Sequence, residues 1–171
     1  MKNVRIKKIY GFTLIETLLY IMIFSIVVFL IFQIYALVLE SRGRQRTTVE
    51  VNEEGSRIIQ MITQNVRNAT SINSPTPANN LDVLSIYTYT TANNPTLYYL
   101  VGNDLVIKEG SATTVILNSN RVKITSLKFT NLSKSGTKGT VKIEFTISSN
   151  TLNTQVFYLF SKTFTADATV R

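Results

Sequence analysis

The feature that most constrains this chain is an apolar run from Phe12 to Leu39, in which Glu16 is the only charged residue. As a helix, its roughly 28 residues extend about 42 Å at ~1.5 Å per residue, enough to cross a hydrocarbon core of ~30 Å with some tilt. A carboxylate in lipid is costly, by about 2.5–3.5 kcal/mol at mid-bilayer. The run therefore predicts a membrane-spanning helix. Because its charge is costly there, Glu16 is a candidate functional residue.

A short basic leader, Met1 to Tyr10, precedes the run and carries Lys and Arg residues but no acid. The run is too long for a secretory signal, and no small-x-small cleavage site follows it. The junction itself, Gly11-Phe12-Thr13-Leu14-Ile15-Glu16, resembles the type IV prepilin signature. Type IV pilins share that signature with the pseudopilins of type II secretion and competence systems.

The resemblance implies a processing site and an assembly site. In that family a membrane-embedded peptidase cuts after the glycine on the cytoplasmic side, here between Gly11 and Phe12, and methylates the new amino terminus on Phe12. The family pairs this amine with the carboxylate of a neighbouring subunit, here that of Glu16, to align subunits in the filament. The implied partners are the prepilin peptidase, the assembly platform with its cytoplasmic ATPase, other pilins and the membrane.

The remaining chain predicts one long helix followed by strands. Four segments are expected: the leader over residues 1–11, the transmembrane and assembly helix over 12–39, an amphipathic half of the same helix over 40–74, and an antiparallel β-sheet domain over 75–171. The amphipathic half shows an apolar stripe at helical spacing, formed by Ile58, Ile62, Val66, Ala69 and Ile72. We expect the helix to continue through at least one of Gly43 and Gly55, and to end at the Ser, Asn and Pro residues from Ser71 to Pro77.

Period-two alternation and turn residues predict the strands of the sheet. Gly102-Asn103-Asp104 predicts a hairpin turn between two of them. The expected strands lie at Val83–Tyr89, Leu97–Val101, Leu105–Lys108, Thr114–Leu117, Arg121–Leu132, from Val141 through Ile147, and Val156–Phe164. The predicted class is α+β, a long helix packed against an antiparallel sheet, which is also the pilin plan. The segment from Val66 to Ile72 resembles the J/W branch of minor pseudopilins.

The amino-acid composition limits the kinds of functional site that the chain can form. The chain has no Cys and no His, so disulfides, thiol nucleophiles and the usual zinc, copper and haem ligands are missing. No phosphate-binding loop or nucleophile elbow occurs, and the acids of the sheet region are scattered: Asp82, Asp104, Glu109, Glu144 and Asp167. We therefore expect no enzyme, no catalytic residues, no metal site and no cofactor.

The sequence as a whole predicts a minor pilin or pseudopilin. We expect it in the cytoplasmic membrane, with the amino terminus inside and the β-domain outside, and then in an extracytoplasmic filament. One alternative is a filament subunit for DNA uptake or adhesion that uses Lys134, Lys138 and the tyrosines at 87, 89, 98 and 99. The formal net charge is +8, and the leader supplies four of these charges. The positive charge left on the rest of the chain is therefore only weak support for nucleic-acid binding. A second alternative is an unprocessed single-span membrane protein with an exported β-domain.

Overall fold

The structure is a computed structural model that describes residues 13–134, 137–150 and 159–171. The chain divides into two compact units after Arg42. A single helix, α1, spans Leu14–Arg67 and contributes to both units. The predicted α+β class is confirmed, because one long helix is followed by antiparallel sheets that its second half packs against.

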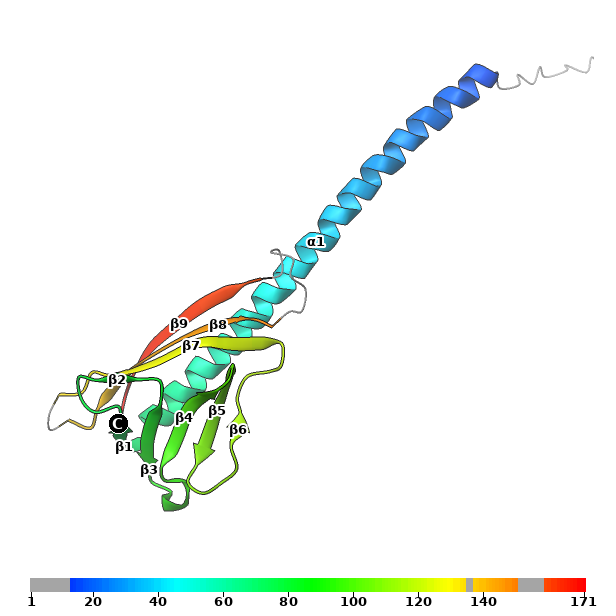
Figure 1. The fold of residues 1–171 in the computed structure, drawn as a ribbon. Helices are drawn as coiled ribbons and strands as arrows, with labels where there is room; N and C mark the ends of the chain where they lie inside the picture. The colour runs from blue at the N-terminus through cyan, green and yellow to red at the C-terminus, as the bar shows by residue number, and fades with distance from the viewer. Residues whose placement is uncertain (1–12, 135–136, 151–158) are drawn as a thin grey trace, which may run out of the picture. The chain divides into compact units, whose positions relative to one another are not determined.

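The described part of the second unit contains two antiparallel sheets rather than the one that the sequence predicts. One sheet has the strand order β1-β3-β4-β5-β6 and the other the order β2-β7-β8-β9. Figure 1 shows both sets of strands gathered along the C-terminal half of α1. The strands are β1 (Ala69–Ser74), β2 (Asn80–Leu81), β3 (Leu84–Thr88), β4 (Thr96–Val101), β5 (Asp104–Glu109), β6 (Val115–Ile116), β7 (Val122–Asn131), β8 (Thr140–Ser149) and β9 (Ser161–Thr169), with a 3-10 turn, η1 (Thr91–Asn93), between β3 and β4.

A stripe of α1 and the inner faces of both sheets form one core. The buried helix residues recur every three or four positions, so they occupy one face: Val51, Gly55, Ile58, Ile62 and Val66. Strand β8 contributes alternate residues that are fully buried: Val141, Ile143, Phe145 and Ile147. The helix continues through both Gly43 and Gly55, in agreement with the expectation.

The hairpin between β4 and β5 forms where the sequence predicts it. Val101 pairs with Asp104, which leaves Gly102 and Asn103 as a two-residue turn. Gly102 has a φ of 64°, a conformation that costs glycine nothing and is typical of the first central position of a type II′ turn.

Two predicted boundaries are wrong. The helix ends at Arg67 instead of continuing to residue 74, because residues 69–74 pair with β3 as strand β1, where Ile72 lies opposite Ile86. The last strand is displaced toward the carboxyl end: β9 covers Ser161–Thr169 rather than Val156–Phe164. The part of the predicted strand up to residue 158 lies outside the described residues.

Candidate functional site: the N-terminal helix

Thr13 and Glu16 define the beginning of α1. The backbone N–H of Glu16 donates to the Thr13 hydroxyl at 3.3 Å and to the Thr13 carbonyl at 3.1 Å. This is half of a capping box, in which a Ser or Thr at the N-cap is followed three residues later by Glu or Gln. The carboxylate of Glu16 also lies in the first turn, where the helix dipole favours negative charge by about 0.3–1 kcal/mol.

The carboxylate of Glu16 has one neutral neighbour. The Tyr20 hydroxyl, one turn further along the helix, donates to it at 3.4 Å, which is long for a hydrogen bond between oxygens. Among residues 13–134, 137–150 and 159–171, no basic side chain forms an ion pair with Glu16. Its charge is therefore not compensated by a cation from the described part of the chain.

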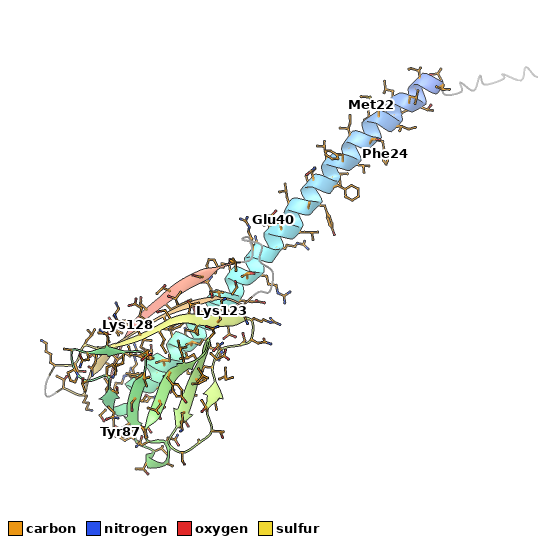
Figure 2. The ribbon with its side chains drawn as sticks, in the orientation of Figure 1. Met22, Phe24, Glu40, Tyr87, Lys123 and Lys128 are labelled. Carbon is orange, nitrogen blue, oxygen red and sulfur yellow. The ribbon has the colours of Figure 1, made fainter. Side chains whose placement is uncertain are left out.

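The surface of α1 from Leu14 to Leu39 is apolar and exposed. Apart from the half-buried Val28, its large apolar side chains have exposed fractions between 41% and 79%. Figure 2 shows the side chains of Met22 and Phe24 extending outward from the helix. Water tolerates contiguous apolar surface of this size poorly, so lipid or other protein must cover it.

The same segment meets the requirements of a bilayer. It contains a window of 18 residues with a mean hydropathy of 2.7, so α1 is long and apolar enough to span a membrane. Two of its hydroxyl side chains donate to backbone carbonyls of the same helix: Thr17 to Leu14 at 2.8 Å and Ser25 to Ile21 at 2.7 Å. This pairing removes the cost of unsatisfied hydroxyl groups in hydrocarbon.

Charged residues follow the apolar segment directly. Arg42, Arg44 and Arg46 come after Glu40 within two turns of helix. In the second unit, Glu50 accepts from Arg46 at 3.2 Å and from Arg121 of the loop before β7 at 3.2 Å. Both arginines are mostly exposed, so these pairs contribute little to stability. The change from apolar to charged composition marks the end of the stretch that suits a hydrocarbon core.

The other candidate residues are either exposed surface residues or lie outside the described part of the chain. Gly11 and Phe12, the predicted processing residues, lie outside the described part of the chain. Lys134 and Lys138 are both exposed, and the Lys138 ammonium donates to the Arg171 carbonyl at 2.8 Å. Among the described residues, no group of three or more acids is arranged to hold a metal ion.

The four tyrosines do not form one surface. Tyr98 is fully buried, and its hydroxyl accepts from the amide of Asn65. Burial raises the pKa of the Tyr98 hydroxyl to about 12, with the Asn65 hydrogen bond opposing the shift and the nearby Glu109 charge adding to it. Tyr89 is 77% exposed and Tyr87 is 38% exposed. The proposal that all four offer stacking surfaces is therefore wrong for Tyr98.

The role of Thr13 at the start of α1 was not among the sequence-based predictions. The pattern Thr13-Leu14-Ile15-Glu16 at the start of an apolar run has the spacing of a capping box, and this signal was sufficient to place the helix start. Glu16 contributes its backbone N–H to this cap, and its carboxylate lies in the first turn, where the helix dipole favours negative charge.

Comparison of the chain with protein-family models, with curated proteins and with solved structures finds no match in any of the three.

Proposed function

We propose that this chain is a structural subunit, a minor pilin or pseudopilin, of a filament that assembles through its N-terminal helix. The leader is removed between Gly11 and Phe12 by a membrane peptidase, and Phe12 becomes the methylated amino terminus. An assembly platform and its ATPase then move the subunit from the cytoplasmic membrane into the filament. The observation that carries this proposal is the apolar, exposed surface from Leu14 to Leu39, with Glu16 at its start, a carboxylate that forms no ion pair with the described part of the chain.

The apolar surface suits the subunit both in the membrane and in the filament. In the membrane, lipid covers it. In the filament, the same surface packs against copies from other subunits, and fully burying one Leu, Ile or Phe side chain there contributes about 1.5–3 kcal/mol relative to leaving it in water. With apolar side chains on every side of the helix, several neighbours find a complementary surface.

Glu16 supports the register between subunits. A carboxylate without a cation in an apolar environment is strongly destabilising, and pairing with a positive group removes most of that penalty. Cleavage creates such a group, because the free amine of Phe12 is positively charged. A carboxylate and an amine at fixed positions on two helices hold them at one axial offset.

The cap at the start of α1 offers a competing explanation for Glu16, and one substitution separates the two. Glu and Gln serve equally at the third position of a capping box, so Glu16→Gln keeps the cap and removes the charge. We expect Glu16→Gln and Glu16→Ala to be processed normally and to be excluded from filaments in a host that carries the assembly machinery. Glu40→Gln, which removes a carboxylate at the other end of the apolar segment, is the matched control and should be incorporated.

The measurement is the amount of each variant in sheared filaments relative to the membrane fraction, together with the mass of its amino terminus. Incorporation of Glu16→Gln at the normal level would show that the residue serves the cap alone. Retention of the leader in that variant would instead assign Glu16 to peptidase recognition.

A further inference from the structure

A small polar pocket lies in the second unit, between the end of α1 and the connection from β3 to β4. Its volume is about 280 Å³. Asn65 and Asn68 line it from the helix end, Tyr89, Thr90 and Asn93 from the connection, and Glu109 from the end of β5. Ile86 and Thr96, both buried, also belong to its wall.

The polar groups of this pocket have unused hydrogen-bonding capacity. Asn65 donates to Tyr98 and Asn93 donates to Glu109 at 3.1 Å, which leaves both amide oxygens as acceptors. Within the described residues, the side chains of Asn68, Tyr89 and Thr90 form no hydrogen bond. The pocket therefore presents donors and acceptors together, beside the exposed ring of Tyr89.

The connection that carries Tyr89, Thr90 and Asn93 is held in place by its ends. The Thr88 N–H donates to the Asn94 side-chain oxygen at 2.6 Å, and the Asn94 amide donates back to the Thr88 carbonyl at 2.9 Å. On the other side, the Gly110 N–H donates to the Pro95 carbonyl at 3.0 Å, with Gly110 at a φ of 51° that favours glycine. A site held in this way loses less entropy when a ligand binds.

We infer that this pocket binds a neutral sugar ring. Hydroxyl groups of a sugar both donate and accept, which matches the mixture of amides, hydroxyls and a carboxylate, while its apolar face packs on an aromatic ring such as Tyr89. Of the described lining residues none is basic, and Glu109 is acidic, so the pocket disfavours phosphate and other anions. An apolar ligand would leave the amides without partners. The volume suits one ring rather than a chain of them.

The test uses the full chain in lipid nanodiscs, because glycoside detergents would compete for the pocket. Saturation-transfer NMR is recorded with glucose, galactose, mannose and N-acetylglucosamine, and with tetramethylammonium as a probe for cation binding. We expect at least one of the sugars to bind with a dissociation constant on the order of 1 mM, typical of a small ligand with few contacts. Tyr89→Ala should weaken that binding by about tenfold, through loss of the aromatic contact.

Tyr87→Ala is the matched control. Tyr87, labelled in Figure 2, is also an exposed tyrosine of the same chain segment, two residues earlier. It does not line the pocket. Its substitution should leave sugar binding unchanged. The inference is overturned if none of the sugars binds, if Tyr87→Ala and Tyr89→Ala weaken binding equally, or if tetramethylammonium alone binds. The outcome does not depend on processing or assembly of the chain.

Discussion

Gly55 of α1 lies against the ring of Phe164 in β9, and its substitution gives a quantitative test of the core. A Cβ built on Gly55 would lie 2.2 to 2.7 Å from three ring atoms of Phe164. That ring cannot move away freely, because it stacks on Phe145 with ring centroids 5.6 Å apart, and the Lys162 ammonium lies 5.0 Å from its centre. Adding one methyl group at Gly55 therefore forces a shift of a packed aromatic pair.

Two opposing effects set the magnitude for Gly55→Ala. Alanine is better than glycine in a helix interior by about 1 kcal/mol. Overpacking a core costs about 1–3 kcal/mol, and contacts far below 3 Å with a stacked ring favour the upper end. We expect a net loss of about 1–2 kcal/mol in the free energy of unfolding, which lowers the melting temperature by roughly 3–10 °C.

The effect of Gly55→Ala on stability should change sign when the Phe164 ring is removed. With Phe164→Ala as the background, Gly55→Ala should stabilise by about 1 kcal/mol, because only the helix propensity remains. The assay is urea unfolding of residues 43–171, which form a compact unit of their own, for the four combinations of these two sites. A destabilisation by Gly55→Ala that persists in the Phe164→Ala background would refute this account of the contact.

Other predictions concern polar groups buried in the same unit. Because the pKa of Tyr98 is about 12 in the folded chain and about 10 when unfolded, folding favours its neutral form. The resulting stability is fully present below pH 10 and is lost as the pH rises through 12, by about 3 kcal/mol. Tyr98→Phe should flatten this decline in unfolding free energy measured between pH 9 and pH 12. Asn118 is buried, accepts from the Leu105 N–H at 2.7 Å and donates to the Val122 carbonyl at 3.1 Å. Asn118→Ala should cost about 2–4 kcal/mol in urea unfolding, whereas exposed Asn120→Ala should cost less than about 0.5 kcal/mol; equal losses would contradict the assignment.

The local part of the fold was predictable because its signals are local. The apolar run and the stripe with Ile58, Ile62 and Val66 predict a helix by their spacing alone. The hairpin at Gly102 follows from turn chemistry, and the alternation in β8 predicts both the strand and its buried face.

The end of the helix was not predictable in the same way. Ala69 and Ile72 continue the helical spacing, yet they lie in β1, because pairing with β3 provides backbone hydrogen bonds that the spacing does not reveal. The last strand shows the same limit. Its residues from Thr165 to Thr169 are short, two alanines among Thr and Asp, and give no strong strand signal. Pairing with β8 fixes their register, with Val141 opposite Ala168.

The division into two sheets depends on which strands pair, and patterning within one strand carries no such information. The pocket at Tyr89 and Glu109 has the same origin, since its residues come from five separate elements, α1, β3, η1, β4 and β5, that only the fold brings together. For the candidate assembly site, by contrast, the sequence identified Glu16, and the structure added the cap that Thr13 provides.

The most direct test of the proposed function is the mass of the amino terminus of the protein isolated from a membrane with an active prepilin peptidase. The proposal predicts a chain that begins at Phe12 and carries one methyl group on its amine. A chain that still begins at Met1 would contradict it, because Glu16 would then have no cleaved amine to pair with.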